Sequence, residues 1–352
     1  MNSQEFWNGK NVLVTGHTGF KGGWLSLWLS ELGVNLHGYS LAPTDQNEFY
    51  SRVFTASYPG SETFADIRDI EILKNKIISI NPDIIFHLAA QPLVRKAFSS
   101  PLETFQVNVM GTVNLLDVLR TSGTSPVVIN VTTDKVYENN EYNQGYREGD
   151  KLGGNDPYSA SKVCSAFATH SYREAYFENS CVRISSARAG NVIGGGDMAR
   201  DRLVPDFLRS LKLNSEVVVR NPLSIRPWQH VLEPISGYLL LAERMAQKNG
   251  KDYSGSWNFG PIGDPRTVED VIKKLMSITG YKNLVIDRNP GPKETNCLML
   301  DSAKAMRMLD WVPRLSVEQA LEWTYNWFTK SERGANMVDF SVQQIHDFTE
   351  LG

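Results

Sequence analysis

Apolar positions near the start of the chain follow two different periods in succession. The run 11–15, NVLVT, has the β-rich composition of a short buried strand, and a glycine-rich turn follows it directly. Beyond the turn, apolar residues fall at helical spacing over 24–32. The pattern therefore predicts a strand, a tight turn and a helix, in that order.

Similar apolar runs recur along the first half of the chain and alternate with helical patterns. Strands are predicted at 34–40, 63–67, 83–91, 126–131 and 182–187, and helices begin near Asp69, Pro101 and Pro157. The run 83–91 is apolar almost throughout, as in a strand buried on both faces of a sheet. Such alternation predicts an α/β fold with a doubly wound, Rossmann-like parallel sheet.

The alternation ends at a glycine-rich segment, 189–197. Later helices are predicted from Arg202 and over 231–245, where the chain returns to the first domain. The helices predicted from Ser302, Ser316 and Asp339 close a smaller α-rich domain. No Gly/Ser linker separates the two domains, so we expect them to exchange segments. The predicted division assigns 1–188 with 226–260 to the first domain and 189–225 with 261–352 to the second.

The glycine turn after the first strand has the chemistry of a phosphate site. Its glycines follow a GxxGxxG spacing rather than the commoner GxGxxG. They let the chain turn tightly and let a diphosphate approach the helix N-terminus, where unpaired N–H groups favour an anion. The setting between a strand and a helix predicts a dinucleotide site. Ser40 and Leu41 end the next strand without the acidic residue typical of NAD sites, so this criterion does not separate NAD from NADP.

A cluster of reactive side chains stands where the strand 126–131 ends. Residues 131–137, VTTDKVY, hold two hydroxyls, a carboxylate, an amine and a phenol. Ligands of open α/β sheets bind beyond the carboxyl ends of the strands, so such a cluster would meet a substrate there. The alternative is a strand that enters a turn stabilised by Thr and Asp side chains.

Tyr158 and Lys162 form a second candidate pair. They lie four residues apart on the helix predicted from Pro157, so both project from one face. An unperturbed tyrosine has a pKa near ~10, and bringing it towards 7 needs about 4 kcal/mol of favourable interaction. A neighbouring ammonium acts in that direction, and a phenolate can take the proton from a hydroxyl group. Such pairs also occur by chance on solvated helices, so the prediction depends on their conjunction with the glycine turn and Thr133.

Charge and cysteine content exclude several classes of protein. The 36 basic residues are scattered and 39 acidic residues outweigh them to a net charge of −3, so no field attracts nucleic acid or an anionic membrane. Neither a membrane span nor a signal peptide is visible, and the sequence predicts a cytoplasmic protein. Cys164, Cys181 and Cys297 fit neither a disulfide framework nor a metal site, and we expect reduced, buried thiols.

Together these motifs resemble those of the short-chain dehydrogenase/reductase superfamily in its extended form. The resemblance is carried by residues 16–22, 88–90 and 158–162 and covers nearly the whole chain. Within the superfamily, Thr132-Thr133-Asp134 beside the Tyr-Lys pair is similar to the nucleotide-sugar 4,6-dehydratases. The longer runs 15–22, 132–137 and 226–231 resemble the same group.

The resemblance implies an internal redox cycle on tightly held NAD. Tyr158 would take the C4 hydroxyl proton as hydride passes to the cofactor, and Asp134 would act as the acid when water is lost across C5 and C6. The stored hydride would then return to C6. Thr133 would hydrogen-bond O4, and Lys162 would hold the nicotinamide ribose and lower the pKa of Tyr158. The implied substrate is a nucleoside-diphosphate sugar, with CDP-glucose expected on resemblance alone.

Lys135 departs from the pattern of this group. The resemblance implies that the related dTDP-glucose and GDP-mannose dehydratases have a glutamate at this position, which serves as the C5 base. An amine with a pKa near ~10.4 must lose about 3 units, or roughly 4 kcal/mol, to be half neutral at pH 7. Burial near Lys162 would lower the pKa, and the adjacent Asp134 would raise it. We therefore expect Lys135 to assist at C5 either as the base or as a cation that stabilises the enolate.

Further residues are assigned to the two ligands by their place in or beside these motifs. The cofactor residues are Gly16, Thr18, Gly19, Phe20, Gly22, Asp66, Ile67, Leu88, Ala89, Ala90, Asn108, Tyr158 and Lys162. The substrate residues are Gln91, Thr133, Asn191, Arg202, Leu203, Val204, Arg226 and Lys293. No metal site is predicted.

Several of these residues have a structural alternative. Asp66 suits the adenine amine but suits a helix start equally. Asn108 is either a surface residue or a brace for a neighbouring loop. The two arginines and Lys293 serve either the nucleotide or a surface ion pair. His87, which lies inside an apolar run, is expected to be a hydrogen-bonded core residue.

Two other functions stay open at this point. A nucleotide-sugar 4-epimerase or a reductase would use the same Tyr-Lys pair without an acid-base pair after Thr133, so Asp134 and Lys135 discriminate between these enzymes. A dinucleotide-sensing regulatory protein would keep the fold without turnover, and the intact Tyr-Lys pair argues against it. From the superfamily we also expect a homodimer or homotetramer that pairs through the helices beginning near Pro101 and Pro157.

Overall fold

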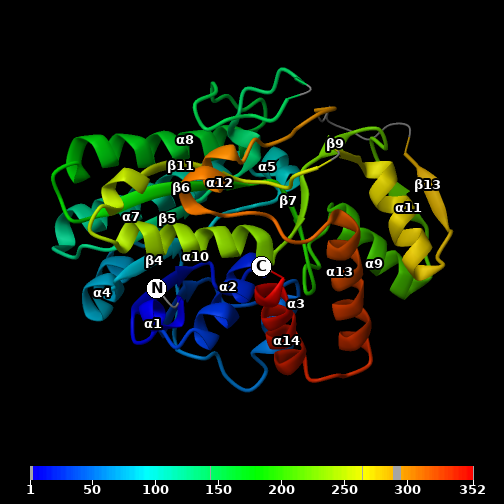
Figure 1. The fold of residues 1–352 in the computed structure, drawn as a ribbon, viewed down its shortest axis with the longest axis horizontal. Helices are drawn as coiled ribbons and strands as arrows, with labels where there is room; N and C mark the ends of the chain where they lie inside the picture. Colours follow the sequence, from blue (N-terminus) through cyan, green and yellow to red (C-terminus); the bar gives the residue numbers. More distant parts are fainter. Residues whose placement is uncertain (1–2, 143, 264, 288–294, 352) are drawn as a thin grey trace.

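A parallel sheet of seven strands forms the centre of the molecule (Figure 1). The computed structural model describes residues 3–142, 144–263, 265–287 and 295–351. The strands are β1 Asn11–Thr15, β2 Asn35–Ser40, β3 Ser61–Phe64, β4 Ile84–His87, β5 Val127–Val131, β6 Arg183–Ala189 and β11 Gly255–Phe259. In space they follow the order β11, β6, β5, β4, β1, β2, β3, and every neighbouring pair is parallel. The predicted doubly wound sheet is confirmed.

The strand order reverses between β1 and β4. Thr15 at the end of β1 pairs in register with His87 at the end of β4, and His87 pairs with Asn130 near the end of β5. The segments that follow these strands, the glycine turn, 88–90 and 132–134, therefore meet at one edge of the sheet. In doubly wound folds this is the edge where ligands bind.

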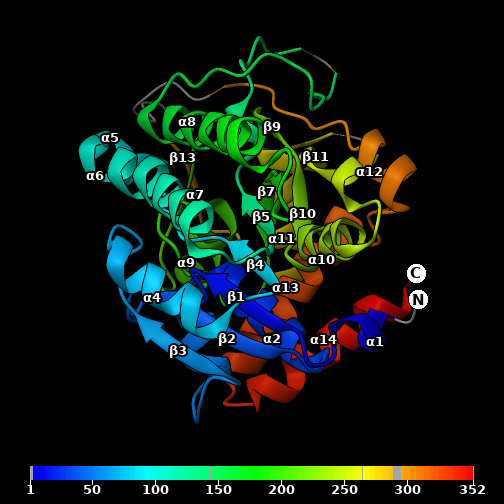
Figure 2. The ribbon, with the colours of Figure 1, turned by 90° about the vertical axis from the view of Figure 1, so that its left-hand side faces the viewer.

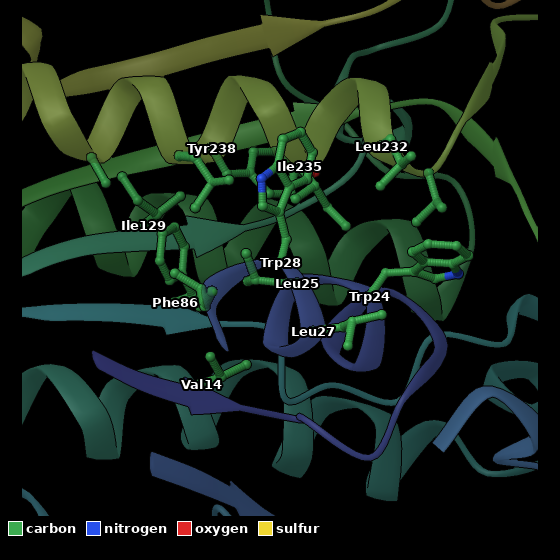
Figure 3. Close-up of a cluster of buried hydrophobic side chains, with 14 of the residues drawn as sticks. Val14, Trp24, Leu25, Leu27, Trp28, Phe86, Ile129, Leu232, Ile235 and Tyr238 are labelled. Atoms are coloured by element: carbon green, nitrogen blue, oxygen red, sulfur yellow. The ribbon is translucent and has the colours of Figure 1, made fainter. Parts of the chain in front are cut away.

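Helices cover both faces of the sheet (Figure 2). One face carries α2 Phe20–Glu31 and α10 Leu232–Ala246, and the other carries α4 Ile70–Ile80, α7 Gly111–Ser122 and α8 Pro157–Tyr172. Figure 3 shows Trp28 of α2 and Ile235 of α10 in one cluster with Phe86 of β4 and Ile129 of β5. Ile85, one residue before Phe86, belongs to the cluster on the opposite face. Burial on both faces explains the unbroken apolar runs, and each such side chain stabilises the fold by about 1.5–3 kcal/mol.

The predicted strand 83–91 is too long, because β4 ends at His87. Beyond it the chain leaves the sheet, and the backbone N–H and carbonyl of Gln91 bond to the side chain of Asn108 instead of a neighbouring strand. A short helix that the pattern did not predict, α5 Val94–Ser99, follows this loop.

The predicted helix from Pro101 is confirmed, with one irregularity. It begins as α6 Pro101–Phe105, passes through a π turn, Gln106–Met110, and continues as α7. The helix α8 ends in a similar π turn, Arg173–Phe177. Asn108 lies inside the first π turn, and such turns often occur at functional sites.

The second half of the molecule is built from helices and two-stranded pieces. Its helices are α9 Leu203–Leu213, α11 Val268–Thr279 and α13 Val317–Glu332. The strand pairs are β7 Asn191–Ile193 with β10 Trp228–His230, β8 Val217–Val219 with β13 Leu284–Ile286, and β9 Ile225–Arg226 with β12 Arg266–Thr267. A separate apolar cluster around Phe207, Leu275 and Leu321 holds these elements together. The α-rich character predicted for this half is therefore accompanied by short strands.

The last helices return to the first half. The helix α12 Ala303–Leu309 contacts β11 and α10, and α14 Met337–Glu350 contacts α2 and α3 Glu48–Val53. The Trp28 and Phe348 rings meet edge to face at 5.8 Å between centroids. Chain segments thus cross between the halves several times, and the division into two domains stays a prediction. The remaining elements are α1 Ser3–Trp7 and the 3-10 turns Asp134–Val136 and Gly250–Tyr253.

Two of the three cysteines contradict the expectation of buried thiols. Cys164 and Cys181 are exposed, Cys297 is buried, and all three are free. Cys164 lies on the outer side of α8, where a small thiol costs little when it faces solvent. Within the described ranges, no helix is long and apolar enough to cross a membrane, and no group of three or more potential ligands could hold a metal ion.

Candidate active site

A cavity of about 710 Å³ lies at the edge where β1, β4, β5 and β6 end, between the two halves of the molecule. Most of the sequence-predicted site residues line it: Gly16, Thr18, Gly19, Phe20, Gly22, Asp66, Ile67, Leu88, Ala89, Ala90, Thr133, Asp134, Lys135, Tyr158, Lys162, Asn191, Arg202, Leu203, Val204 and Arg226. Gln91 and Asn108 stand behind the wall, and Lys293 lies outside the described residues.

The glycine turn forms one end of the cavity. Gly16 has φ +77°, and a Cβ there would come within 2.8 Å of the Ala89 nitrogen. A Cβ on Gly22 would collide with the Gly16 carbonyl oxygen. The helix α2 begins after Gly19 without a capping side chain, so its first N–H donors are left for an anion. The turn therefore has the close packing and the donors that a diphosphate site requires.

Asn108 and Gln91 support this wall from behind. The Asn108 amide oxygen accepts from the Gln91 N–H at 2.7 Å, and its Nδ2 donates to the Gln91 carbonyl at 3.1 Å and to the Ser161 hydroxyl at 2.9 Å. The Gln91 side chain bonds Thr104 and Leu93. Asn108 is 1% exposed, so the surface alternative is wrong and the brace alternative is confirmed. Both side chains hold the loop that carries Ala89 and Ala90.

Asp66 stands at the end of the cavity beyond β2 and β3. Its carboxylate accepts from the Arg68 guanidinium at 2.6 and 3.0 Å, and these bonds lower its pKa. Asp69, not Asp66, caps α4 by accepting from the Ile72 N–H, so the helix-start alternative for Asp66 is wrong.

The polar cluster after β5 lies at the centre of the cavity wall. Thr133 caps the short 3-10 turn, where its hydroxyl accepts from the Lys135 N–H and donates to Asp134 Oδ1 at 3.0 Å. Asp134 is 3% exposed, and its Oδ2 has no partner among the described residues. Burial raises the pKa of Asp134, while Lys135, the Thr133 hydroxyl and Arg226 oppose the shift. The carboxyl group is therefore shifted towards its protonated, proton-donating form.

Tyr158 and Lys162 reach the same region from α8. A capping box at Asp156 fixes the first turn of α8, with the Asp156 carboxylate accepting from the Tyr158 N–H at 2.9 Å. Burial raises the Tyr158 pKa to about 12, while a hydrogen bond with Thr133 and the charge of Arg202 lower it. Burial lowers the Lys162 pKa to about 8, and its amine donates to the Val131 carbonyl at 3.4 Å. The effect of Lys162 on the Tyr158 pKa stays a prediction.

Arg202 forms an ion pair at the cavity, and its side chain is 34% exposed. Its guanidinium donates to Asp197 Oδ2 at 2.7 Å, and Asp197 is 6% exposed in the wall of the cavity. Arg226 is also buried and, like the half-buried Lys135, lines both this cavity and a neighbouring one of about 550 Å³. Lys135 thus lies at the junction of the two cavities, next to Asp134.

His87 is a core residue, as expected. Its two ring nitrogens bond the hydroxyls of Thr15 at 2.8 Å and Thr112 at 3.3 Å, and burial lowers its pKa to about 3. Sequence reasoning missed Lys21 and Asp197, which both line the cavity. Lys21 stands inside the glycine turn itself, and that position is the signal that could have found it. Asp197 ends the glycine-rich segment 189–197, next to residues that were assigned.

The fold and this site define a class of protein, and comparison with known families identifies it. The chain belongs to the GDP-mannose 4,6-dehydratase family, whose model matches residues 13–324. Among individual proteins, the chain is 45% identical over 356 residues to the CDP-glucose 4,6-dehydratase of Salmonella typhimurium, across 99% of this chain and 98% of that protein. The predicted resemblance to nucleotide-sugar 4,6-dehydratases is confirmed.

Solved structures show the same fold. A dTDP-glucose 4,6-dehydratase from Streptomyces venezuelae, solved with NAD bound, superposes with a TM-score of 0.78 at 23% identity, over 93% of this chain and 99% of that one. A UDP-glucose 4-epimerase from Thermotoga maritima gives a TM-score of 0.79 at 23% identity, over 92% and 99%. Because dehydratases and epimerases share the fold, the reaction must be inferred from the site.

Proposed function

We propose that the protein removes water from a nucleoside-diphosphate hexose and converts CDP-D-glucose into CDP-4-keto-6-deoxy-D-glucose. The observation that carries the proposal is Asp134, a buried carboxyl group in the cavity wall, hydrogen-bonded to Thr133 and electrostatically coupled to the Tyr158 phenol. A dehydration needs an acid at this place, whereas an epimerisation or a reduction does not. The Salmonella relative carries the name of this reaction.

The residues at the glycine turn fit NAD as the cofactor. The uncapped first turn of α2 suits the diphosphate, and the small side chains of Ala89 and Ala90 leave room beside the loop that Asn108 braces. The Streptomyces structure contains NAD, which supports the same choice here. Bound NAD supplies a hydride acceptor for C4 and later a hydride donor for C6, so no external reductant is consumed.

The chain's own residues divide the proton transfers between them. Tyr158 takes the proton of the C4 hydroxyl, and the Thr133 hydroxyl binds O4 beside it. Burial raises the pKa of the phenol to about 12, so neighbouring positive charge is needed to form the phenolate that accepts this proton. Arg202 and the positive charges of Lys162 and the oxidised cofactor favour the phenolate during the reaction. Asp134 then gives its proton to the hydroxyl that leaves C6.

Lys135 is our candidate for the C5 proton. Apart from Asp134, it is the one ionisable residue of the 3-10 turn, and it lines the cavity next to Asp134. As a neutral amine it would remove the proton, and as a cation it would stabilise the enolate formed at C4. Arg202 and Arg226, both in the cavity wall, would bind the diphosphate of the sugar nucleotide.

Incubation with CDP-glucose, dTDP-glucose, UDP-glucose and GDP-mannose, followed by NMR and mass spectrometry, tests the proposal. We expect a 4-keto-6-deoxy product, lighter by one water, from CDP-glucose in preference to the others. A C4 epimer of unchanged mass would identify an epimerase. Binding of NAD without conversion of any sugar nucleotide would identify a regulatory protein.

An exposed apolar face supports the expectation of a homodimer. The helices α5, α6 and α8 are in contact and present Phe98, Leu102, Phe105 and Phe167 to solvent, and Leu102 is 72% exposed. Large exposed apolar side chains on neighbouring helices are typical of interaction sites. A second copy of the chain, pairing through the same helices, is the proposed partner of this face. The cytoplasmic location of the protein also stays a prediction. Light scattering at micromolar concentration should give the mass of two or four chains, and Leu102→Glu should give the mass of one.

A further inference from the structure

The 3-10 turn Asp134–Val136, which carries the candidate acid and its neighbouring lysine, is held weakly by its own hydrogen bonds. The Thr133 hydroxyl accepts from the Lys135 N–H at 3.3 Å, and the Tyr137 N–H donates to the Asp134 carbonyl at 3.4 Å. Both distances exceed the usual range of about 2.7–3.2 Å for such bonds. The strand β5 fixes the start of the turn, so the placing of its side chains depends on what holds the far end.

The Tyr137 side chain anchors that far end in the core. It is 1% exposed, and its hydroxyl donates to Asn258 Oδ1 and accepts from Arg188 Nη1, each at 2.7 Å. The Arg188 guanidinium also lies over the Tyr137 ring, 4.9 Å from the ring centroid. Arg188 belongs to β6 and Asn258 to β11, the two strands that continue the sheet beyond β5 (Figure 1). One phenol thus ties the turn to the sheet.

Arg188 is a buried cation without an ion pair to a carboxylate in the described part of the chain. It is 2% exposed, and besides Tyr137 it donates to the Ser256 hydroxyl at 2.9 Å and to the Glu148 carbonyl at 3.3 Å. The backbone around Tyr137 pairs with 151–153, in the same loop as Glu148, so Arg188 supports the turn from that side as well. Burial of a charge without an ion pair destabilises a fold, so packing alone does not account for a guanidinium at this position.

The residues that serve the two stages of the proposed reaction have different supports. Tyr158 and Lys162, which serve the oxidation at C4, stand on α8, whose first turn is fixed by its own capping box. Asp134 and Lys135, which serve the loss of water, stand on the 3-10 turn. A change at Tyr137 should therefore displace the second pair and leave the first pair in place.

We propose that Arg188, acting through the Tyr137 phenol, is a positioning residue that holds Asp134 and Lys135 in place for the loss of water across C5 and C6. This inference rests on the proposed function. Arg188 transfers no proton and is not among the residues that line the two cavities. It acts by fixing the geometry on which proton transfer at C5 and C6 depends.

Single-turnover mixing of the NAD-loaded protein with CDP-glucose tests the proposal, because the absorbance of the reduced nicotinamide separates the two stages. The absorbance rises as C4 is oxidised, and it falls once water has left and the hydride returns to C6. In Tyr137→Phe, we expect the rise to keep its rate and the fall to slow by about ten- to hundredfold, because small misplacements of reacting groups have effects of that size. The kcat should fall with it, while the KM for CDP-glucose stays as it was.

The matched control is Tyr146→Phe. Tyr146 is 4% exposed and stacks on Tyr137 at 5.2 Å between ring centroids, but within the described ranges its hydroxyl bonds Asn139 and Asn140 and not the turn. Both variants lose buried hydrogen bonds, so their unfolding temperatures should decrease alike, whereas Tyr146→Phe should keep the rates of both phases. Arg188→Lys keeps the charge without the planar fork and should show the same selective slowing, also if Tyr137→Phe does not fold.

Equal slowing of the rise and the fall in Tyr137→Phe would reduce Tyr137 to a residue of the general fold and overturn the inference. Unchanged rates in both phases would overturn it too. If the unmodified protein shows neither phase and forms no product, the proposed function itself fails.

Discussion

Two buried carboxyl groups lie in different regions of the molecule, and burial acts on the pKa of both in the same direction. Asp134 follows β5 at the cavity, and Glu233 lies in the first turn of α10. They are 3% and 0% exposed, and each has one oxygen without a partner among the described residues. Burial raises the pKa of both groups, that of Glu233 to about 7.

The difference between them lies in what they face. Glu233 Oε1 accepts from the backbone N–H groups of Arg314 and Leu315 at 2.9 and 2.6 Å, and so joins α10 to the segment before α13. Asp134 lines the cavity beside Tyr158 and Lys135. A raised pKa therefore records burial, and only the cavity and the neighbouring reactive groups make one of the two carboxyls a candidate acid.

Replacing the cavity acid should have the largest effect. In Asp134→Asn we expect product formation from CDP-glucose to fall by about 10²–10⁴-fold, because general acid catalysis at C6 is lost. The amide keeps the shape of the side chain, so thermal unfolding should change little. The matched control, Glu233→Gln, should leave turnover nearly unchanged. Equal losses in the two variants would abolish the distinction between the two carboxyl groups.

The pH dependence of turnover sharpens the same distinction. The active form of Asp134 is protonated, so the rate of water loss should decline as pH rises through its elevated pKa, up to about tenfold per pH unit. Single-turnover rates measured across the pH range in which the protein stays folded follow this decline. The residual rate of Asp134→Asn should lack it, and an identical decline in that variant would assign the titration to another group.

Replacing Glu233 should affect stability instead. Its folded pKa of about 7 lies above the 4.5 of an ordinary glutamate, so the protonated group contributes stability at acidic pH that is lost as pH rises through 7. This pH-dependent contribution is about 3 kcal/mol at most. The unfolding temperature of Glu233→Gln should therefore decrease less between pH 5 and 8 than that of the unmodified protein.

The exposed position Glu178 offers the control, because Glu178→Gln should keep the pH dependence of the unmodified protein. Unfolding temperatures measured at matched ionic strength decide the matter. An unchanged pH dependence in Glu233→Gln would show that Glu233 does not titrate in this range.

The smallest expected effect concerns Lys135. In Lys135→Met, uptake of solvent deuterium at C5 of a 4-keto substrate analogue should slow markedly, while binding of NAD should stay as it was. NMR of the recovered analogue measures the exchange. Exchange at the original rate would show that Lys135 has no part in proton removal at C5, and Asp134 would be the one catalytic residue of the pair.

Local patterns predicted most of the fold and much of the site. The glycine turn, the strand before it and the helix after it follow from residues close together in sequence, and so do Thr133 and the Tyr158–Lys162 spacing. The early end of β4 did not follow, because it depends on Asn108, seventeen residues beyond Gln91. The pairing of Arg202 with a buried Asp197 could not be predicted from the sequence either, because Asp197 becomes buried only in the folded chain.

The most direct test of the central claim uses CDP-glucose labelled with deuterium at C4. An enzyme that lends the C4 hydride to its bound cofactor and returns it to C6 must place the label in the new methyl group. We predict a 4-keto-6-deoxy product with deuterium at C6, detected by NMR, and no accumulation of reduced cofactor. Deuterium that stays at C4 in an epimerised sugar, or that leaves with free NADH, would contradict the account.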